Sequence, residues 1–360
     1  MRFGRAALTP VLPLAVVLAF GAPPAAQAAC TVDEISSAGV TGFQEAVISV
    51  GDLDAALNAW RDVGEFEVIC TGTQSQAEAV FWGVPAETRI DEVVLRKPGM
   101  TRGFVRLVKF NGLPQVQIRS SGMTWDSGGI LDLYMYVDNT PAVFDRLRAL
   151  GWQSYNDPVT YSLSSFTITE VIVRGPNGEA LCLMQRDAPP YDKTVFGLVD
   201  GSGKGFGWPF NSALASADYE PGAKFFGETL GWKMHLGGES KSEPPGDNPL
   251  GLPKNLAIEL PRKFGAFAPH PTDRNGSIQV ITSEGIVGRD FSGRAHAPNL
   301  GILTLRVPVP DLDAFARDFT AKGGKIAAPA RDLAIAPYGK VKMLAIAAPN
   351  GARIEFFENH

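Results

Sequence analysis

Three side chains on one short segment have the types and spacing that could support chemistry. Residues 132–137 alternate in character as a strand does, so Asp132, Tyr134 and Tyr136 would share one face. A carboxylate can act as a general acid or base, and phenol rings suit an apolar or aromatic ligand that their hydroxyls orient. The alternative is that these aromatic side chains only pack in a core.

Nucleotide-binding and nucleophile motifs do not occur in the sequence. It contains no P-loop, no glycine fingerprint for dinucleotides and no Gly-x-Ser-x-Gly segment. The four histidines do not have the i, i+4 spacing of a helical metal site. The sequence therefore supports neither a nucleotide partner nor serine-hydrolase chemistry.

Composition limits the class of protein and its partners. The chain has 360 residues, of which 45% are hydrophobic and 20% are charged, with a formal net charge of −5. These values are typical of a globular protein, and the length suggests two domains. No run of Lys and Arg provides the positive surface that a nucleic-acid partner requires.

The N-terminus predicts export. Arg2 and Arg5 precede an apolar stretch at 11–20, and residues 26–28 read Ala-Gln-Ala, which fits a signal-peptidase site. We therefore expect residues 1–29 to be a signal peptide and the mature protein to be periplasmic or secreted. No other segment is long and apolar enough to be expected to span a membrane.

The three cysteines allow one disulfide in an oxidising compartment. We expect a Cys30–Cys70 pair, because Cys182 lies in a predicted core strand. A lipoprotein signal that acylates Cys30 is a less favoured alternative. The residue three positions earlier is normally aliphatic in such signals, and here it is Gln27.

A pattern of strand, helix and glycine recurs four times along the chain. In each copy a short alternating strand leads to Asp or Asn, then to a helix that ends at Gly. Asp and Asn side chains accept hydrogen bonds from the first turn of a helix, and Gly adopts the left-handed backbone that follows the last turn. The four pairs are Asp52 and Gly64, Asn139 and Gly151, Asp218 and Gly231, and Asp311 and Gly323.

Three further strand-like stretches follow each helix, so the repeat is a β-α-β-β-β module. In the first module we expect them at 79–82, 91–95 and 104–110. The second and fourth modules share a Pro-Asn-Gly turn, within 175–178 and 348–351, which the first and third lack. The modules therefore alternate in type.

This four-fold chain resembles the vicinal oxygen chelate superfamily, which includes glyoxalase I, bleomycin-resistance proteins and extradiol dioxygenases. The resemblance rests on VGDLDAALNAWRDVGEFEV, VPDLDAFARDFTAKGG, RGPNGEALCLMQR and APNGARIEFFE, and covers roughly residues 40–360. It implies an α+β fold in which four βαβββ modules pair into two cup-shaped mixed sheets, with a site in the cup. Sequential pairing is the simplest arrangement, with a first glyoxalase-like domain at 38–187, a linker at 188–205 and a second glyoxalase-like domain at 206–360.

The resemblance also implies where a divalent metal would bind, on the first and last strands of each module. In the first domain an arginine at one of these positions would repel a cation, and no position in either domain carries His. A metal is therefore possible but not favoured, and Glu45 and Asp132 would be its ligands. The implied positions are Glu45, Arg106, Asp132 and Cys182 in the first domain, and Asn211, Gln279, Thr304 and Glu355 in the second.

Without a metal, the first domain would bring two carboxylates beside an arginine. We expect Glu45 and Asp132 to transfer a proton next to a carbonyl, while Arg106 holds an enolate or a substrate carboxylate. Glu355 is the corresponding acid–base candidate in the second domain. The alternative is a buried ion-pair network that fills the vacated metal site.

The remaining candidates would line the cups and contact substrate. Cys182 is either a small core residue or a nucleophile activated by Arg106. Together these features predict an exported lyase or isomerase acting on a small, partly apolar metabolite. Alternatives are a metal-free binding protein of the bleomycin-resistance type, a metal-dependent dioxygenase or glyoxalase, and an interaction scaffold. The expected substrate contacts are Tyr134, Tyr136, Cys182 and Trp82 in the first domain, and Asn211, Gln279 and Thr304 in the second.

Overall fold

The computed structural model describes residues 42–163, 165–198, 205–241, 248, 251–255, 260–270 and 272–359. The predicted signal peptide at 1–29 and Cys30 lie outside these residues. Cys70 is disulfide-bonded, and Cys182 is a free, buried thiol. Within the described ranges, no helix has the length and apolar character needed to cross a membrane.

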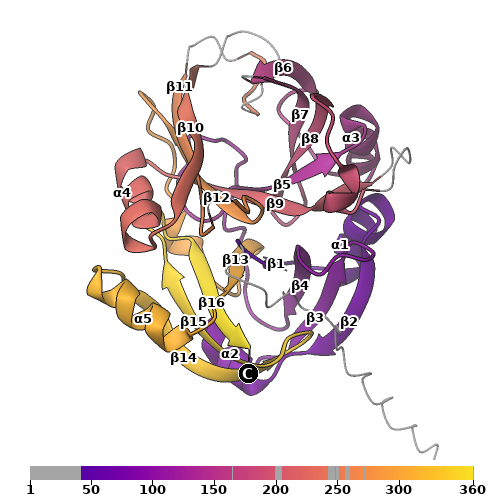
Figure 1. The fold of residues 1–360 in the computed structure, drawn as a ribbon. Helices are drawn as coiled ribbons and strands as arrows, with labels where there is room; N and C mark the ends of the chain where they lie inside the picture. The colour runs from indigo at the N-terminus through magenta and orange to yellow at the C-terminus, as the bar shows by residue number, and fades with distance from the viewer. Residues whose placement is uncertain are drawn as a thin grey trace, which may run out of the picture.

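The described strands form two curled sheets, each of eight strands (Figure 1). The first sheet has the order β14-β15-β16-β13-β1-β4-β3-β2, and the second has the order β10-β11-β12-β9-β5-β8-β7-β6. The strands of the first sheet are β1 (Glu45–Ser49), β2 (Glu67–Thr73), β3 (Ile90–Arg96), β4 (Phe104–Phe110), β13 (Gly301–Pro308), β14 (Ile326–Ile335), β15 (Gly339–Ala347) and β16 (Arg353–Asn359). Those of the second are β5 (Asp132–Val137), β6 (Val159–Leu163), β7 (Phe166–Arg174), β8 (Ala180–Ala188), β9 (Phe206–Ala215), β10 (Lys233–Lys241), β11 (Pro261–Ala268) and β12 (Ser277–Ser283).

The modules pair across the two halves of the chain. Module 1 (β1–β4) shares the first sheet with module 4 (β13–β16), and module 2 (β5–β8) shares the second sheet with module 3 (β9–β12). The central strand pairs are antiparallel, with Glu45 opposite Arg306 in the first sheet and Asp132 opposite Ala213 in the second. The predicted sequential pairing, in which 38–187 and 206–360 each build one cup, is therefore wrong.

Two long connections make this crosswise pairing possible. Residues 111–131 carry the chain from β4 in the first sheet to β5 in the second, and residues 284–300 carry it back from β12 to β13. The two connections run side by side, with a parallel bridge between Gln117 and Leu300. A connection of this length can cross to another sheet, whereas a tight turn would hold consecutive modules together.

Four of the described helices, α1, α3, α4 and α5, begin where the sequence predicts. The main helices are α1 (Leu53–Leu57), α2 (Gln76–Trp82), α3 (Thr140–Ala149), α4 (Tyr219–Lys224) and α5 (Leu312–Ala321), and π-helical turns η1 (Asn58–Val63) and η3 (Phe225–Thr229) extend α1 and α4. The side chains of Asp52, Asn139, Asp218 and Asp311 each accept a backbone hydrogen bond at the start of α1, α3, α4 and α5. Gly151, Gly231 and Gly323 adopt a positive φ as expected, whereas Gly64 does not, and Glu65 takes the left-handed conformation after it.

One predicted strand is a helix. Residues 79–82 belong to α2, which begins at a capping box formed by Ser75 and Glu78 and ends at Gly83 with φ 80°. These local signals outweigh the β-branched and aromatic residues Val80, Phe81 and Trp82 that favour a strand. This helix lies against β14 of the first sheet.

The helices of consecutive modules pack together and so join the two sheets. η1 of module 1 contacts α3 of module 2, and the ring of Trp60 on η1 packs edge-on against Phe206 of β9. On the other side of the molecule, Phe225 of η3 packs against Phe319 of α5, with 6.0 Å between ring centroids. One hydrophobic core therefore spans both sheets.

Strand alternation divides each sheet into an apolar face and a polar face. In the second sheet Leu133 and Leu183 join the core with the helices, so Asp132 and Cys182 point to the opposite, concave face. In the first sheet Val105 and Leu107 face the helices, and Arg106 points to the concave face. The concave faces therefore carry the polar side chains that could take part in chemistry.

Candidate functional site

The crosswise pairing redistributes the predicted site residues between the two concave faces. Glu45 and Arg106 lie in the first sheet, whereas Asp132 lies in the second. The predicted cluster of Glu45, Arg106 and Asp132 is therefore not formed, because it assumed that modules 1 and 2 share a sheet. The first sheet instead holds Glu45, Arg106, Thr304 and Glu355, and the second holds Asp132, Tyr134, Tyr136, Cys182, Asn211 and Gln279.

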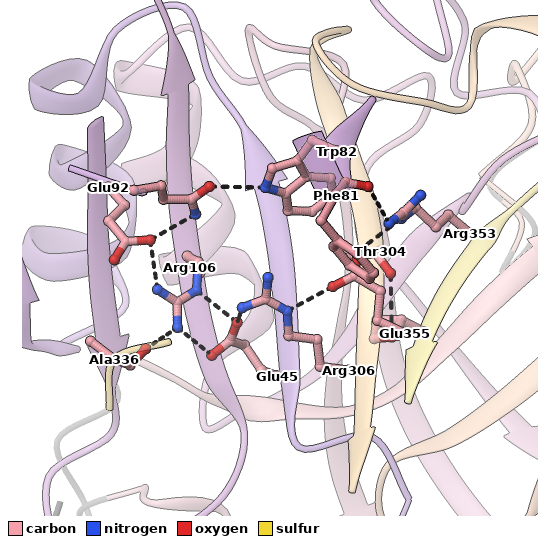
Figure 2. A network of polar contacts seen from close by, with 12 residues as sticks. Glu45, Phe81, Trp82, Glu92, Arg106, Thr304, Arg306, Ala336, Arg353 and Glu355 are labelled. Atoms are coloured by element: carbon pink, nitrogen blue, oxygen red, sulfur yellow. Dashed lines mark hydrogen bonds and ion pairs between the residues drawn. The ribbon is translucent and has the colours of Figure 1, made fainter. Parts of the chain in front are cut away.

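A buried chain of ion pairs fills the concave face of the first sheet (Figure 2). Arg106 binds Glu45 with two hydrogen bonds, Nε to Oε1 at 2.8 Å and Nη2 to Oε2 at 3.1 Å. Arg306 donates from Nη1 to the same Glu45 Oε1 at 2.8 Å, and from Nε to Glu355 Oε2 at 2.8 Å. The side chains of Glu45, Arg106 and Glu355 are fully buried.

Further hydrogen bonds extend this network at both ends (Figure 2). At one end Glu92 accepts from Arg106 Nη1 at 2.7 Å and from Gln74 Nε2 at 2.8 Å. At the other end Arg353 Nε donates to Glu355 Oε1 at 2.8 Å. Three carboxylates thus meet three guanidinium groups, so the charges balance.

Helix α2 and the β14–β15 turn cover the network. The guanidinium of Arg353 lies 4.8 Å from the ring centroid of Phe81 and 5.3 Å from that of Trp82. The indole of Trp82 donates to Gln74 Oε1 at 2.9 Å, and Arg106 Nη2 donates to the carbonyl of Ala336 in the turn. Trp82, predicted to contact substrate, is therefore packed against the ion pairs.

The electrostatics hold this network in its charged form. Burial alone raises the pKa of Glu45, but the guanidinium groups of Arg106 and Arg306 outweigh burial, and the pKa is lowered. Burial lowers the pKa of Arg106, but Glu45 and Glu92 raise it well above the usual value. This face matches the predicted alternative of an ion-pair network better than it matches an acid–base site.

The first sheet does not fit a divalent metal. The carboxylates of Glu45 and Glu355 are bridged by Arg306, and Arg106 closes the other side of Glu45. A cation placed between them would contact two guanidinium groups at close range, where repulsion is strong in a buried site. The hydroxyl of Thr304 donates to its neighbour's carbonyl at 3.4 Å and adds no charge.

The concave face of the second sheet carries a carboxylate without a partner. Asp132 has no exposed surface, and neither of its carboxylate oxygens forms a hydrogen bond with a described residue. Burial and the nearby Glu170 raise its pKa to about 7, against smaller opposite effects of Arg119 and the backbone of Ala213. Asp132 therefore changes charge close to neutral pH.

Glu170 is a second buried carboxyl group on this face. Its Oε2 accepts a hydrogen bond of 2.8 Å from the hydroxyl of Tyr161, and burial raises its pKa to about 7. Burial raises the pKa of the Cys182 thiol well above its usual value, and Glu170 and Asp132 add to this. The thiol therefore stays protonated, and Arg106, its predicted activator, lies in the other sheet.

Amide and aromatic side chains complete the second concave face. Asn211 accepts a hydrogen bond of 2.9 Å from Ser277 Oγ and lies 3.4 Å from Gln279 Oε1. The ring of Phe210 stacks on Tyr136, with 4.3 Å between centroids, and packs edge-on against Tyr134. These groups can orient a small molecule through polar ends and apolar rings.

The second sheet does not supply a metal site of the expected kind. Among the residues that the structure describes, no three His, Cys, Asp or Glu side chains are arranged to hold a metal ion. Of the four implied positions here, only Asp132 carries a carboxylate, and the thiol of Cys182 is a poor ligand while protonated.

Sequence reasoning missed several residues of both faces. Arg306 and Arg353 complete the first network, and Glu170, which accepts from Tyr161, completes the second face. A detectable signal was present for Glu170, since this charged residue stands at an alternating position among the β-branched residues of 167–174, in one of the strand-like stretches expected in the second module. The pairing of Arg306 with Glu45 had no such signal, because it depends on which modules meet.

Comparison with known proteins supports the fold. No protein-family model and no curated protein matches the chain. Glyoxalase I from Zea mays is similar in structure, with a TM-score of 0.57 and 15% identity over 89% of this chain and 92% of that one. A putative dioxygenase from Bacillus subtilis has a TM-score of 0.52 and 13% identity over 89% of this chain and 86% of that one. The chain thus has a glyoxalase-like fold, with four βαβββ modules in two curled sheets.

Proposed function

We propose that the protein is an enzyme that moves a proton next to a carbonyl group of a small, partly apolar molecule, at the concave face of the second sheet. The single observation that carries this proposal is Asp132, a fully buried carboxylate whose two oxygens have no partner among the described residues. A buried polar group without a partner is costly, so proteins keep such groups mainly where a ligand or a reaction uses them.

Asp132 and Glu170 are suited to acid–base chemistry near neutral pH. A general acid or base works best when its pKa lies close to the working pH, and both groups have pKa values of about 7. The two groups interact, so they titrate as a pair. In the proposed reaction the ionised Asp132 removes a proton from the carbon, and a protonated carboxyl group returns one.

A neutral hydrogen-bond donor would stabilise the enolate oxygen in this reaction. The amide of Gln279 lies on the same face as Asp132 and can donate without being charged. Arg106, expected to hold the enolate, cannot do so because it lies in the first sheet. The reaction class is that of an isomerase, an epimerase or a lyase.

The first sheet would support the structure without taking part in the reaction. Glu45 and Glu355, both predicted to be acid–base residues, are fully engaged with arginines. Under the proposed export by residues 1–29, the enzyme would act on a periplasmic or extracellular metabolite. These compartments would also give Cys70 the oxidising conditions that a disulfide requires.

Proton exchange tests the proposed function even while the product is unidentified. The mature protein is incubated in D2O with a panel of small carbonyl compounds, and the signal of the C–H group next to the carbonyl is followed by proton NMR. We expect at least one compound to exchange, and Asp132→Asn to slow that exchange by about 100-fold or more.

A surface variant serves as the control for this test. Asp313 is 60% exposed and pairs with Lys342 on the first sheet, so Asp313→Asn removes the same charge far from Asp132 and should exchange at the wild-type rate. Unchanged exchange in Asp132→Asn, or no exchange of any compound, would overturn the proposal.

A binding protein that performs no reaction is the second candidate. It is favoured by the aromatic contacts, in which Tyr136 stacks on Phe210 and Tyr134 packs against the same ring. Under this alternative, Tyr134→Ala would weaken ligand binding while Asp132→Asn would leave it unchanged.

A further inference from the structure

The two concave faces are related by the internal repeat, and their charges differ. Strands β1 and β9 occupy equivalent central positions, each parallel to the last strand of its own module and antiparallel to the first strand of its partner module. By register, Asn211 in the second sheet is the equivalent of Glu45 in the first. Tyr134, which lies opposite Asn211, is the equivalent of Arg306, which lies opposite Glu45.

Arg106, a second arginine of the first network, also has a neutral equivalent in the second sheet. Val47 lies beside Arg106 on one side and Thr304 on the other, whereas the equivalent Ala213 lies beside Gln279 and Asp132. The positions of Arg106 and Arg306 thus carry the neutral residues Gln279 and Tyr134 in the second sheet. The positions of their partners Glu45 and Glu355 carry the neutral residues Asn211 and Cys182. The buried carboxyl groups of the second face, Asp132 and Glu170, stand at other positions, and among the described residues no guanidinium group binds them.

The cations near the second face do not replace these arginines. Arg119, from the connection at 111–131, donates to the carbonyls of Gly128, Met123 and Asp126, at 2.8, 3.0 and 2.9 Å. Arg262 on β11 donates to Ser240 Oγ at 3.3 Å. Among the described residues, neither arginine forms a salt bridge with Asp132 or Glu170.

We propose that the second concave face binds a small molecule with a positively charged amine, whose ammonium group supplies the cationic partner that Asp132 and Glu170 lack among the described residues. This inference rests on the proposed function, because it assigns the substrate class of the same site. Two observations point to a cationic ligand. The carboxylate of Asp132 has no hydrogen-bond partner among the described residues, and the neighbouring rings of Tyr134 and Tyr161 would also attract a cation. An amine with an apolar body fits both features.

Such a ligand would also prepare the base for the reaction. In the free protein burial keeps the carboxyl groups protonated up to about pH 7, with Cys182 and Tyr134 as uncharged neighbours at that pH. An adjacent ammonium ion favours the charged form and lowers the pKa of Asp132 and Glu170. Binding therefore releases protons to the solvent below pH 7, and leaves a carboxylate ready to accept a proton from carbon.

Calorimetry with matched pairs of ligands tests this inference. Benzylamine, cyclohexylmethylamine and isobutylamine are each compared with the alcohol of the same shape, using the mature protein at pH 6 in two buffers of different ionisation enthalpy. We expect at least one amine to bind about tenfold or more tightly than its alcohol, and to release protons, whereas the alcohol releases none.

Variants assign the effect to this face. Asp132→Asn and Glu170→Gln should each weaken amine binding by about tenfold and reduce the proton release, while Asp313→Asn should change neither. Amines that bind no better than alcohols, or amine binding that Asp132→Asn does not weaken, would overturn the inference.

The outcome can be separated from that of the proposed function. Exchange of protons on carbonyl compounds without any preference for amines would keep the proposed function and overturn the amine assignment. Amine binding with proton release, but no exchange on any carbonyl compound, would keep the ligand class and overturn the catalytic proposal.

Discussion

Glu45 and Arg306 form a buried ion pair of 2.8 Å, although 261 positions separate them in the chain. Glu45 begins β1 in the first module, and Arg306 lies on β13 in the fourth. This contact exists only because the first sheet joins these two modules. The same pairing places Asp132 in a different sheet from Glu45. It thus separates a closed ionic network from a face whose carboxylate has no partner in the described part of the chain.

Removing one member of the ionic network should destabilise the protein strongly. Arg106→Met leaves the buried carboxylates of Glu45 and Glu92 with fewer partners, and we expect the free energy of unfolding to fall by about 3–5 kcal/mol. Urea denaturation measures this change. The control Lys342→Met breaks a surface ion pair with Asp313, which should cost about 0–1 kcal/mol. A similar small loss in both variants would contradict the prediction.

The carboxyl group of Asp132 should make stability depend on pH. Its pKa is near 3.9 when unfolded and about 7 when folded, so between these values the folded state holds a proton that the unfolded state has released. The stability of the wild-type protein therefore falls across this range, by up to about 1.4 kcal/mol per pH unit for this group. The free energy of unfolding of Asp132→Asn should equal that of the wild type near pH 4 and exceed it by about 1 kcal/mol or more at pH 8.

Urea titrations of both proteins at a series of pH values check this prediction. Asp313→Asn is the matched control, because its exposed carboxylate is paired with Lys342 and its pKa is lowered by that contact. A difference between Asp132→Asn and wild type that is constant with pH would show that the folded-state pKa is not raised.

The first concave face should not bind a divalent metal. After incubation with Mn²⁺, Co²⁺, Ni²⁺ or Zn²⁺ and removal of the excess, elemental mass spectrometry of the untagged protein should find no metal that depends on Glu45. The physical reason is that Arg106 and Arg306 already neutralise this carboxylate. About one metal ion per chain, lost in Glu45→Gln, would be the contrary result.

Each half of the chain should be unable to fold by itself. A chain of residues 38–187 contains β1 and β5 but lacks their antiparallel partners β13 and β9. We expect this half to be unfolded or to self-associate, and to form a stable one-to-one complex when it is co-expressed with residues 206–360. Circular dichroism and analytical ultracentrifugation distinguish these states, and a folded monomeric half would contradict the observed pairing.

The modules could be predicted because their signals are local. Asn139 and Asp311 cap helices through their own side chains, and Gly151 and Gly323 end the same turns with a positive φ. These interactions involve residues a few positions apart, so the sequence contains all of the information. The error at 79–82 also had local causes, since the capping box of Ser75 and Glu78 could have identified the helix.

The choice of partner modules could not be predicted in the same way. Each module presents a similar first strand to its partner, so β1 could pair with β5 as plausibly as with β13. The structure decides this through the connections at 111–131 and 284–300 and through helix contacts such as Phe225 with Phe319. Such contacts join residues that are far apart in the chain, and a single sequence does not state which of them form.

The sequence by itself determined the four modules, the fold class and part of the set of polar residues on the concave faces. Only the tertiary structure decided which of these residues meet, because ion pairs and desolvation act between atoms a few ångströms apart. It placed Arg306 against Glu45, which closes one face, and left Asp132 buried on the other without a partner among the described residues. A buried carboxylate therefore serves structure in one sheet and, under the proposed function, is available for chemistry in the other.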